Sequence, residues 1–355
     1  TKRPHYLDEL SSFDINDIEN KYSNEELSWK LISSPTIASK KWVYEQYDSQ
    51  VLTNTVSING DAAIIRLKEI PGKAIALSTD CNERYVYLDA YQGGLAAVCE
   101  GARNVVCVGA EPIAITNCLN FGNPYDPEVY WQFKEAVRGI RDACIALNTP
   151  VTGGNVSFHN ESQNNAIFPT PVIGMLGIID NLDDRMSLEF KQNGDIIYLI
   201  GNNREELGGS EVIKIITGKI LGTAPIINIE DEIALQKLTL DLIHNHIINA
   251  THDVAEGGIA IALAEMAIAS KKYGCNVNLD KLSLGNLFGE SQSRIIVTLP
   301  SQKITEFEKT CNKYNIPFFK LGNVIEDNFV INNLIKTTIT NITEKWDNAL
   351  ENQLR

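Results

Sequence analysis

One stretch of this chain, residues 78–124, and the segment TGGNVSFHNES that follows it constrain the fold more than any other part. Apolar runs in these segments end on side chains that carry oxygen atoms, a carboxylate at Asp80 and amides at Asn117 and Asn155. The glycine pair 153–154 stands where a strand is expected to break, and glycine lets backbone N–H groups approach phosphate oxygens closely. Carboxylate and amide oxygens are also ligands that Mg²⁺ prefers. The pattern predicts a surface that handles a nucleotide.

Length and composition set the broad class. A chain of 355 residues is too long for one ordinary core, so two domains are expected. No apolar run reaches membrane-spanning length and the first residues lack a secretory signal, which predicts a cytoplasmic protein with no membrane partner. The net charge of -14 argues against a nucleic-acid partner, because phosphate backbones require clustered Lys and Arg.

The seven cysteines form no CxxC pair and no metal-ligand spacing. They are expected to be reduced, mostly buried thiols. The chain begins at Thr1 without an initiator methionine, which suggests an excised or processed part of a longer protein.

The apolar pattern divides the chain into an arm and two α/β or α+β domains. Residues 1–50 are predicted to be a helical linker arm, residues 51–182 a first domain and residues 190–355 a second, with a charged, broken segment between the domains. In the arm, Ser34 is the expected N-cap of a helix that Pro35 opens.

Two further local predictions follow from side-chain types. The arm's aromatic residues, Trp42, Tyr44 and Tyr47, are expected to pack onto the domain that follows. In the first domain, apolar residues at three-to-four spacing predict a helix that Asp126 caps and Pro127 opens.

Several blocks are long enough to indicate a family. From SSPTIASKKWVYEQYD at Ser33 to LFGESQSRIIVTLP at Leu287, the chain resembles the second half of phosphoribosylformylglycinamidine synthase, a purine-pathway ligase, in its smaller-subunit form. The resemblance implies the two-domain, PurM-like fold shared with aminoimidazole ribonucleotide synthetase, preceded here by the helical arm. The first domains of that fold pair across a sheet interface.

The resemblance also implies the chemistry. ATP, with Mg²⁺, phosphorylates the formyl-amide oxygen of formylglycinamide ribonucleotide, and ammonia derived from glutamine then displaces phosphate to give formylglycinamidine ribonucleotide. The implied partners are the first half of the same enzyme, a glutaminase subunit, a small PurS-type subunit and the ribonucleotide substrate.

Four site residues carry over from the family motifs. Gly154 matches a glycine that contacts ATP, Asn155 an asparagine that holds Mg²⁺, and Ser157 a serine that touches the ribonucleotide. Asn117 matches an ATP-contacting position where many relatives carry aspartate, so it supplies no negative charge for a metal. Without the surrounding blocks, the glycine pair would be read as a tight turn with a local asparagine hydrogen bond.

Asp61, Asp80 and Asp253 have two readings. They could furnish a second, pseudosymmetric nucleotide site, since Asp253 precedes glycines that open a helix. They could equally be helix caps and turn formers. The ESQ block, Glu290 to Gln292, resembles a block that binds substrate in the family's first half. In this chain it either binds a ligand or is a structural remnant of that block without a binding role.

The acid-base histidine is expected outside this chain. In the family's first half it lies in an HNHPS-type block, and the matching positions here are Asn82, Glu83 and Arg84, which cannot shuttle a proton near neutral pH. The chain's own histidines, including His252, are predicted to be surface or capping residues.

Two other functions remain open at this stage. One is a structural or regulatory module that holds a nucleotide without turning it over. The other is a homodimeric small-molecule kinase of the same superfamily. A sheet edge that pairs with the first half would be exposed in the isolated chain, which predicts a homodimer through that edge.

Overall fold

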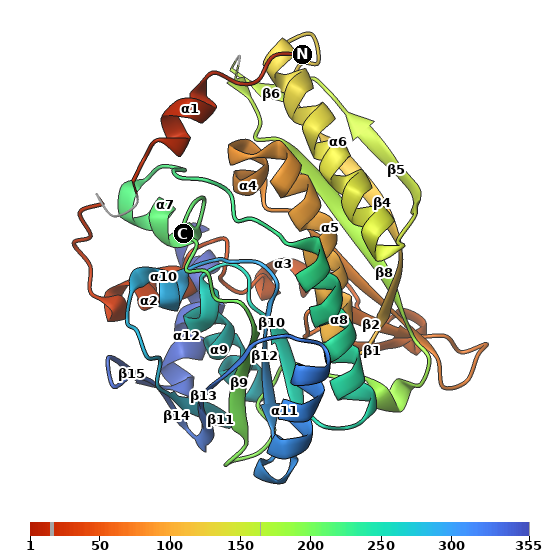
Figure 1. The fold of residues 1–355 in the computed structure, drawn as a ribbon, viewed down its shortest axis with the longest axis vertical. Coiled ribbons are helices and arrows are strands. Elements are labelled where there is room, and N and C mark those ends of the chain that lie inside the picture. The colour runs from red at the N-terminus through yellow and green to blue at the C-terminus, as the bar shows by residue number, and fades with distance from the viewer. Residues whose placement is uncertain (15–17, 164, 355) are drawn as a thin grey trace.

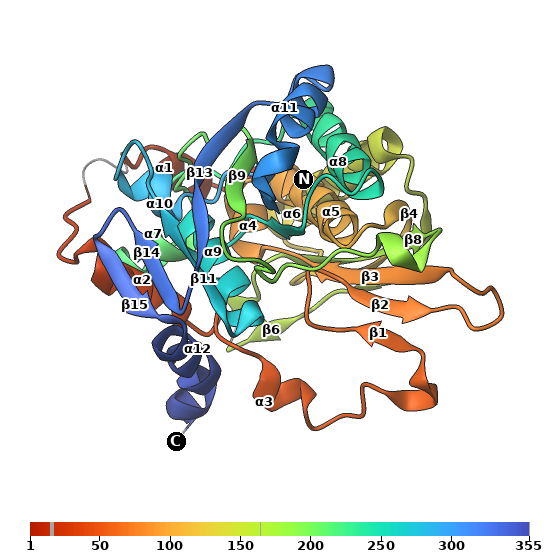
Figure 2. The same cartoon turned by 90° about the horizontal axis from the view of Figure 1, so that it is seen from below.

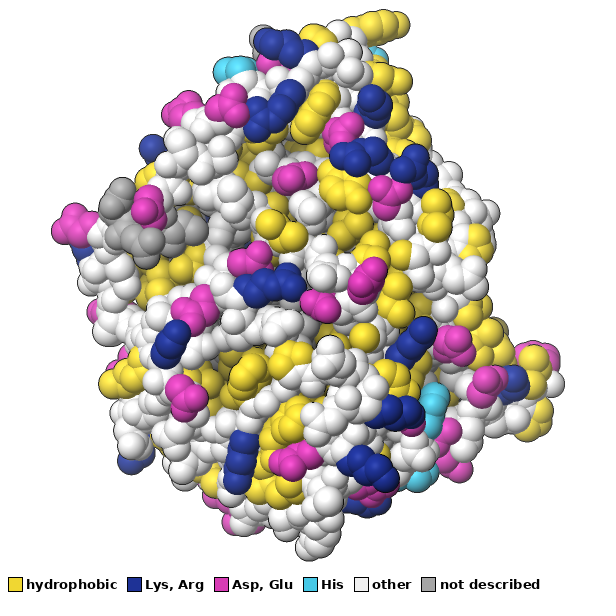
Figure 3. Space-filling view, viewed as in Figure 1, with side chains coloured by type: hydrophobic (Ala, Val, Ile, Leu, Met, Phe, Trp, Pro, Cys, Tyr) yellow, Lys and Arg dark blue, Asp and Glu magenta, His cyan; other side chains and the backbone are white. Residues whose placement is uncertain are grey.

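The computed structural model describes residues 1–14, 18–163 and 165–354. Two large mixed sheets organise the chain, and helices pack on each of them (Figure 1). This mixed α/β architecture confirms the predicted fold class. Within the described ranges, no helix is both long enough and apolar enough to cross a bilayer. On the face drawn in Figure 3, basic and acidic side chains are interspersed.

The first sheet has six strands in the order β1-β2-β3-β8-β4-β5. They are β1 (Thr55–Ser57), β2 (Ala63–Arg66), β3 (Ala74–Asp80), β8 (Thr170–Ile179), β4 (Glu111–Asn120) and β5 (Val151–Ser157). Neighbouring strands are antiparallel except β4 and β5, which run parallel. A separate two-stranded ribbon joins β6 (Glu161–Ser162) and β7 (Asn165–Ala166).

In the described part of the chain, the three helices of the first domain pack on one face of the first sheet. They are α4 (Glu83–Leu88), α5 (Ala90–Cys107) and α6 (Pro127–Leu147), and Figure 2 shows α5 and α6 on one side of β3 and β8. Side chains along β8 alternate, so that Ile173 and Met175 are fully buried in the core beneath α5 while Leu176 between its buried neighbours is only partly covered. On β3, Leu77 is 40% exposed. The opposite face of this sheet is therefore open.

The second sheet has seven strands in the order β10-β12-β9-β13-β11-β14-β15. They are β10 (Ala250–Asp253), β12 (Arg294–Leu299), β9 (Ile196–Gly201), β13 (Phe318–Glu326), β11 (Tyr273–Val277), β14 (Asn328–Ile331) and β15 (Ile335–Thr338). Its helices are α7 (Glu211–Thr217), α8 (Ile229–His244), α9 (Gly258–Ser270), α10 (Leu284–Phe288), α11 (Ile304–Lys313) and α12 (Ile339–Leu354). The described residues also include the short 3₁₀ turns η2 (Val51–Thr53), η3 (Leu182–Asp184) and η4 (Ser301–Lys303).

The interior strand β9 is buried on both faces. Ile197 and Leu199 join the core that contains α9, whereas Tyr198 and Ile200 join the core beneath α8 and α11. The second sheet is thus packed on both sides near its centre, unlike the first.

The arm contacts both domains, each of which is built on one of the two sheets. Its α1 (Tyr6–Ser11) stacks Tyr6 on Tyr87 with ring centroids 4.4 Å apart, and its α2 (Asn24–Ile32) buries Leu27 and Leu31 in the core of the second sheet. The indole Nε1 of Trp346 on α12 then donates to the Ile37 carbonyl at 2.9 Å. The arm is therefore held by apolar burial as well as by hydrogen bonds.

The predicted helix start at Ser34 is wrong. Helix α2 begins earlier, where Ser23 and Glu26 form a reciprocal capping box, and it ends at Ile32. Pro35 then opens only one turn, in which the Ala38 N–H donates to the Ser34 carbonyl at 2.7 Å. The prediction for α6 is confirmed, since the Asp126 side chain accepts from the Glu128 N–H and Pro127 is the first helical residue.

The predicted packing of the arm's aromatic residues is also wrong. Trp42, Tyr44 and Tyr47 are 51%, 42% and 76% exposed. They lie on or just after α3 (Lys41–Tyr44), on the side of the first sheet opposite α5 and α6 (Figure 2). These aromatic side chains are therefore largely open to solvent and do not join the core of the first domain.

The burial of α2 gives a stability prediction. Leu31→Ala should lower the free energy of unfolding by about 2–5 kcal/mol, because Leu31 is fully buried and its loss leaves a cavity. Leu334→Ala is the matched control, since Leu334 is 48% exposed and its change should stay within about 0.5 kcal/mol. Urea unfolding monitored by circular dichroism measures both, and equal losses would show that α2 is not part of the core.

Candidate functional site

The first group of predicted residues comes together at the β4/β5 edge. The parallel pairing sets Asn117 opposite Gly154 and Cys118 opposite Asn155. Ser157 follows at the end of β5, where its hydroxyl lies 3.1 Å from the amide nitrogen of Asn160. All four predicted residues therefore lie on adjacent strands, Asn117 on β4 and Gly154, Asn155 and Ser157 on β5.

The glycine pair does not form the predicted bend. Residues 151–157 are one continuous strand, and the ladder to β4 runs through both glycines. Gly154 has a φ of 154°, and a side chain there would collide with the Asn117 amide. Glycine is thus needed at this position because a neighbouring strand's side chain fills the space. Asn117 also lies within β4, which continues to Asn120, and not at a strand end.

This edge is open to solvent. Residues 151–156 are all exposed, and no strand among the described residues pairs with the outer side of β5. Its donors are amides, hydroxyls and backbone groups. Within the described ranges, no group of three or more His, Cys, Asp or Glu side chains is arranged to hold a metal ion. An Mg²⁺ ion held by Asn155 would have to draw most of its ligands from phosphate oxygens or from another chain.

The second group, Asp61, Asp80 and Asp253, lies between the two sheets. Asp80 accepts from the Ser78 hydroxyl at 2.8 Å and from the Asn104 amide at 2.7 Å. Burial raises the pKa of Asp80 to about 7, and the charge of Asp253 contributes. The backbone N–H of Asp253 donates to Asp61 at 3.3 Å. These carboxylates are close neighbours, and they are already engaged with the protein.

Arg103 on α5 joins the two sheets through this group. Its guanidinium is fully buried and donates to Asp253 at 2.6 Å, to Glu232 at 2.8 Å and to the side-chain oxygen of Gln292 at 2.8 Å. A buried guanidinium is tolerated only when its donors are met in this way. Sequence analysis did not single out Arg103, because its partners lie more than a hundred residues away.

His252 was predicted to be a surface or capping residue, and this prediction is wrong. The side chain is buried between two carboxylates, with Nδ1 2.6 Å from Asp61 and Nε2 3.0 Å from Glu265. Burial alone would lower its pKa, but the two carboxylates outweigh burial and raise the pKa well above its usual value. The result is a buried imidazolium that bridges the two domains.

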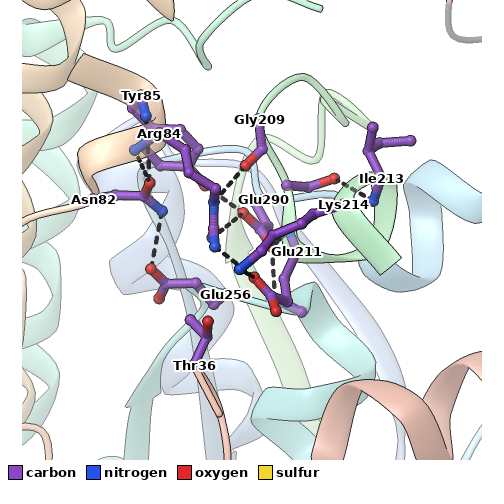
Figure 4. Close-up of polar contacts among 12 residues, drawn as sticks. Thr36, Asn82, Arg84, Tyr85, Gly209, Glu211, Ile213, Lys214, Glu256 and Glu290 are labelled. Carbon is purple, nitrogen blue, oxygen red and sulfur yellow. Dashed lines mark hydrogen bonds and ion pairs between the residues drawn. The ribbon is translucent and has the colours of Figure 1, made fainter. Parts of the chain in front are cut away.

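A third cluster surrounds Arg84 on α4 (Figure 4). Its Nη1 lies 2.5 Å from Glu211 and its Nε donates to the Gly209 carbonyl at 2.8 Å. The Tyr85 hydroxyl donates to Glu290 at 2.5 Å, and the Asn82 amide donates to Glu256 at 2.9 Å. The positions that match the family's histidine block thus bind the protein's own second domain.

The ESQ block belongs to these buried networks. Glu290 accepts from the backbone N–H groups of Glu211 and Gly257, each at 2.9 Å, and Gln292 accepts from Arg103. The Ser291 hydroxyl accepts from the Glu206 N–H at 3.1 Å. Each residue of the block is 0–2% exposed, so in this chain its side chains stabilise the domain contact.

Comparison with known families agrees with this architecture. The model described as "AIR synthase related protein, N-terminal domain" matches residues 59–179, and "AIR synthase related protein, C-terminal domain" matches residues 192–332. The chain therefore belongs to the AIR synthase related family, which confirms the superfamily indicated by the sequence.

Solved structures give the same fold. PurL of T. maritima complexed with FGAR superposes with a TM-score of 0.74 at 17% identity, over 91% of this chain and 54% of that one. The PurLQS structure from T. maritima gives 0.70 at 17% identity, over 96% and 54%. The HypE-HypF complex gives 0.60 at 16% identity, over 84% and 97%. This chain spans about half the length of the PurL chains it matches.

The buried carboxyls predict a pH dependence. Burial, followed by the charge of Glu290, raises the pKa of Glu256 to about 7, so the folded chain holds this proton more tightly than the unfolded chain does. The stabilisation that the protonated Glu256 carboxyl gives the folded chain is therefore fully present below about pH 4.5, and it is lost as the pH rises through about 7.

Glu256→Gln should flatten that loss, since Gln keeps an oxygen for Asn82 but cannot ionise. Urea midpoints measured from pH 5 to pH 8 are the readout, and the wild type should weaken over this range by on the order of 1 kcal/mol or more relative to the variant. Parallel curves for the two proteins would contradict the assignment.

Proposed function

We propose that this chain is the second half of a phosphoribosylformylglycinamidine synthase of the PurL type. The observation that carries the proposal is the match of both family domains to about half of T. maritima PurL, for which complexes with FGAR, ADP and ATP have been solved. The complete enzyme would convert formylglycinamide ribonucleotide, ATP and ammonia to formylglycinamidine ribonucleotide, ADP and phosphate.

In this proposal the chain contributes binding groups at the β4/β5 edge. Asn117 and Gly154 contact ATP, Asn155 supplies an amide oxygen to the magnesium ion that accompanies the nucleotide, and Ser157 contacts the ribonucleotide. The adjacency of these residues and the exposure of Gly154 and Asn155 support these roles, because an open edge is accessible to a ligand shared with another domain. Catalysis of this type depends chiefly on positioning and charge stabilisation.

The acid-base group would come from outside the chain. Arg84 and Asn82 are committed to buried contacts, and His252 is held between two carboxylates. Activity in the isolated half is therefore not expected. A glutaminase subunit that delivers ammonia and a small PurS-type subunit are the further proposed partners, in line with the PurLQS assembly solved from T. maritima.

The open face and edge of the first sheet are the proposed contact with the first half. This sheet and the segments next to its strands carry several apolar side chains that are 38–51% exposed: Ile58, Leu77, Val151, Val156 and Phe168. Exposed apolar side chains on an uncovered sheet favour a protein interface there. Without the first half, the same surface would pair two copies of this chain.

A structural or regulatory module is the second candidate. Two features favour this candidate for the isolated chain. Arg84 and Arg103 are engaged in buried ion pairs within the protein, and the acid-base histidine is expected outside the chain. Equilibrium dialysis separates the two ideas, since a structural site would retain ADP through purification whereas a half-site would bind weakly until the first half is added.

Replacing Asn155 tests the catalytic proposal. In the enzyme reconstituted with the first half and glutaminase, Asn155→Ala should reduce kcat/KM at least about tenfold, equivalent to ~1.4 kcal/mol of transition-state stabilisation. The control is Asn312→Ala, an exposed asparagine on α11 that should leave activity unchanged. Wild-type turnover by the Asn155 variant would refute its role.

Leu77→Asp tests the proposed interface. A carboxylate on the open sheet face should weaken association with the first half, or self-association of the isolated chain, at least tenfold, because the buried charge would lack a partner. Sedimentation velocity measures this. Ile145→Asp is the control, since Ile145 is 72% exposed on α6 and lies on the opposite side of the sheet. Equal behaviour of the two variants would place the contact elsewhere.

A further inference from the structure

The tripeptide Asn-Gly-Asp occurs twice in this chain, as residues 59–61 and as residues 193–195. In both copies the asparagine is exposed, and the aspartate side chain is largely buried and hydrogen-bonded. Asparagine followed by glycine is prone to lose its side-chain amide, because glycine has no side chain to keep its backbone nitrogen away from the amide carbon. The two copies therefore place the same chemistry in two different backbone settings.

The second copy is held by its backbone. The Gly194 N–H donates to the Val324 carbonyl at 3.0 Å, and the Val324 N–H donates to the Asp195 carbonyl at 2.9 Å. The Asp195 N–H in turn donates to the Gln192 carbonyl at 3.3 Å. The Gly194 nitrogen cannot turn toward the side chain of Asn193 without giving up its hydrogen bond to Val324.

The first copy lies in the loop between β1 and β2, and its backbone is free at the same position. Among the described residues, no hydrogen bond involves the Asn59 side chain or the Gly60 N–H. The space beside Gly60 is also uncrowded, since a Cβ atom built there would lie 3.5 Å from Val108 Cγ1, an ordinary contact distance. The Gly60 nitrogen is therefore able to approach the Asn59 amide carbon without breaking a bond of the fold.

We infer that Asn59 is a site of spontaneous deamidation in the folded chain, and that Asn193 is protected from the same reaction. The Gly60 nitrogen loses its proton and forms a bond to Asn59 Cγ, the Cγ–Nδ2 bond breaks, and Nδ2 leaves as ammonia. The product is a five-membered succinimide ring. Water, the only co-reactant, then opens the ring at either carbonyl carbon. One opening gives aspartate, and the other gives isoaspartate, whose main chain runs through the β-carbon.

The position of Asn59 gives this reaction a structural consequence. Asp61, two residues further on, lies 2.6 Å from His252 Nδ1 and accepts from the Asp253 N–H at 3.3 Å. The loop therefore carries one of the contacts between the two domains. Both products replace a neutral amide by a carboxylate, and isoaspartate also lengthens the main chain beside Asp61. Deamidation thus weakens the contact between Asp61 and His252, and this inference does not depend on the function proposed above.

Peptide mapping of the aged protein tests the site. The purified chain is incubated at mildly alkaline pH, and mass spectrometry follows the conversion of amide to acid at residues 59 and 193 in the same digest. Isoaspartate is counted with an isoaspartyl methyltransferase and labelled S-adenosylmethionine. The conversion at Asn59 should be at least severalfold faster than at Asn193. Equal rates, or a faster reaction at Asn193, would overturn the inference.

The same incubation in urea separates the effect of the fold from that of the sequence. Unfolding breaks the hydrogen bond between Gly194 and Val324, so the two identical tripeptides should then react at similar rates. A difference that persists in urea would arise from the flanking residues and would contradict the structural argument.

Two variants test the mechanism and its consequence. Gly60→Ala should slow the loss at Asn59 at least severalfold, because the new methyl group hinders the approach of the nitrogen while the fold has room for it. Asn59→Gln should abolish the loss, since glutamine would have to form a less favourable six-membered ring. On ageing, the melting temperature should fall in the wild type and stay constant in Asn59→Gln. An equal fall in both proteins, or no fall in wild type whose Asn59 has been converted, would refute the link to Asp61.

Discussion

A buried network of ion pairs fixes the two domains of this chain relative to each other. Arg103 from α5 is fully buried and meets Asp253, Glu232 and Gln292 of the second domain, and His252 bridges Asp61 and Glu265. Removing such charges from water is costly, so the network is stable only while every donor keeps its partner. The geometry of this contact therefore leaves little room for an independent hinge between the sheets.

This constraint separates two surfaces of the molecule. On the inner one, between the domains, most of the buried carboxylates pair with the chain's own cations, although Arg84 Nη2 and Gln292 Nε2 have no hydrogen-bond partner among the described residues. The outer one, the open face and β5 edge of the first sheet, leaves amides, hydroxyls and apolar side chains exposed. An unpaired edge strand and an uncovered sheet face are features that proteins normally protect by pairing. The proposed function uses this outer surface, where a second domain would complete both the sheet contact and the ligand site.

Local signals made much of the fold predictable. The Asp126 cap and Pro127 marked the start of α6, because both act within one turn of the helix. The capping box at Ser23 was missed in favour of Ser34, although its serine and glutamate are equally local. The glycine pair was predicted to form a bend, but Gly154 is needed because Asn117 on the neighbouring strand occupies the space that a side chain would fill. A single sequence does not show which strands will be neighbours.

The buried ion pairs could not be predicted from the sequence either, because the paired residues are far apart along the chain. Arg103 and Asp253 are 150 residues apart, and Asp61 and His252 are 191 apart. No spacing rule links residues so far apart in the sequence. Arg103 was therefore given no special role, and His252 was predicted to be a surface or capping residue. Family motifs gave Asn117, Gly154, Asn155 and Ser157, and the pairing of β4 with β5 brings all four to one edge of the sheet.

The most direct measurement is a crystal structure of this chain assembled with its first half and soaked with a non-hydrolysable ATP analogue. The account predicts phosphate density against the β4/β5 edge, within hydrogen-bond reach of Gly154 and Asn155, with Arg84 still bound to Glu211. Phosphate density between Asp80 and Asp253, beside a bare β5 edge, would contradict it.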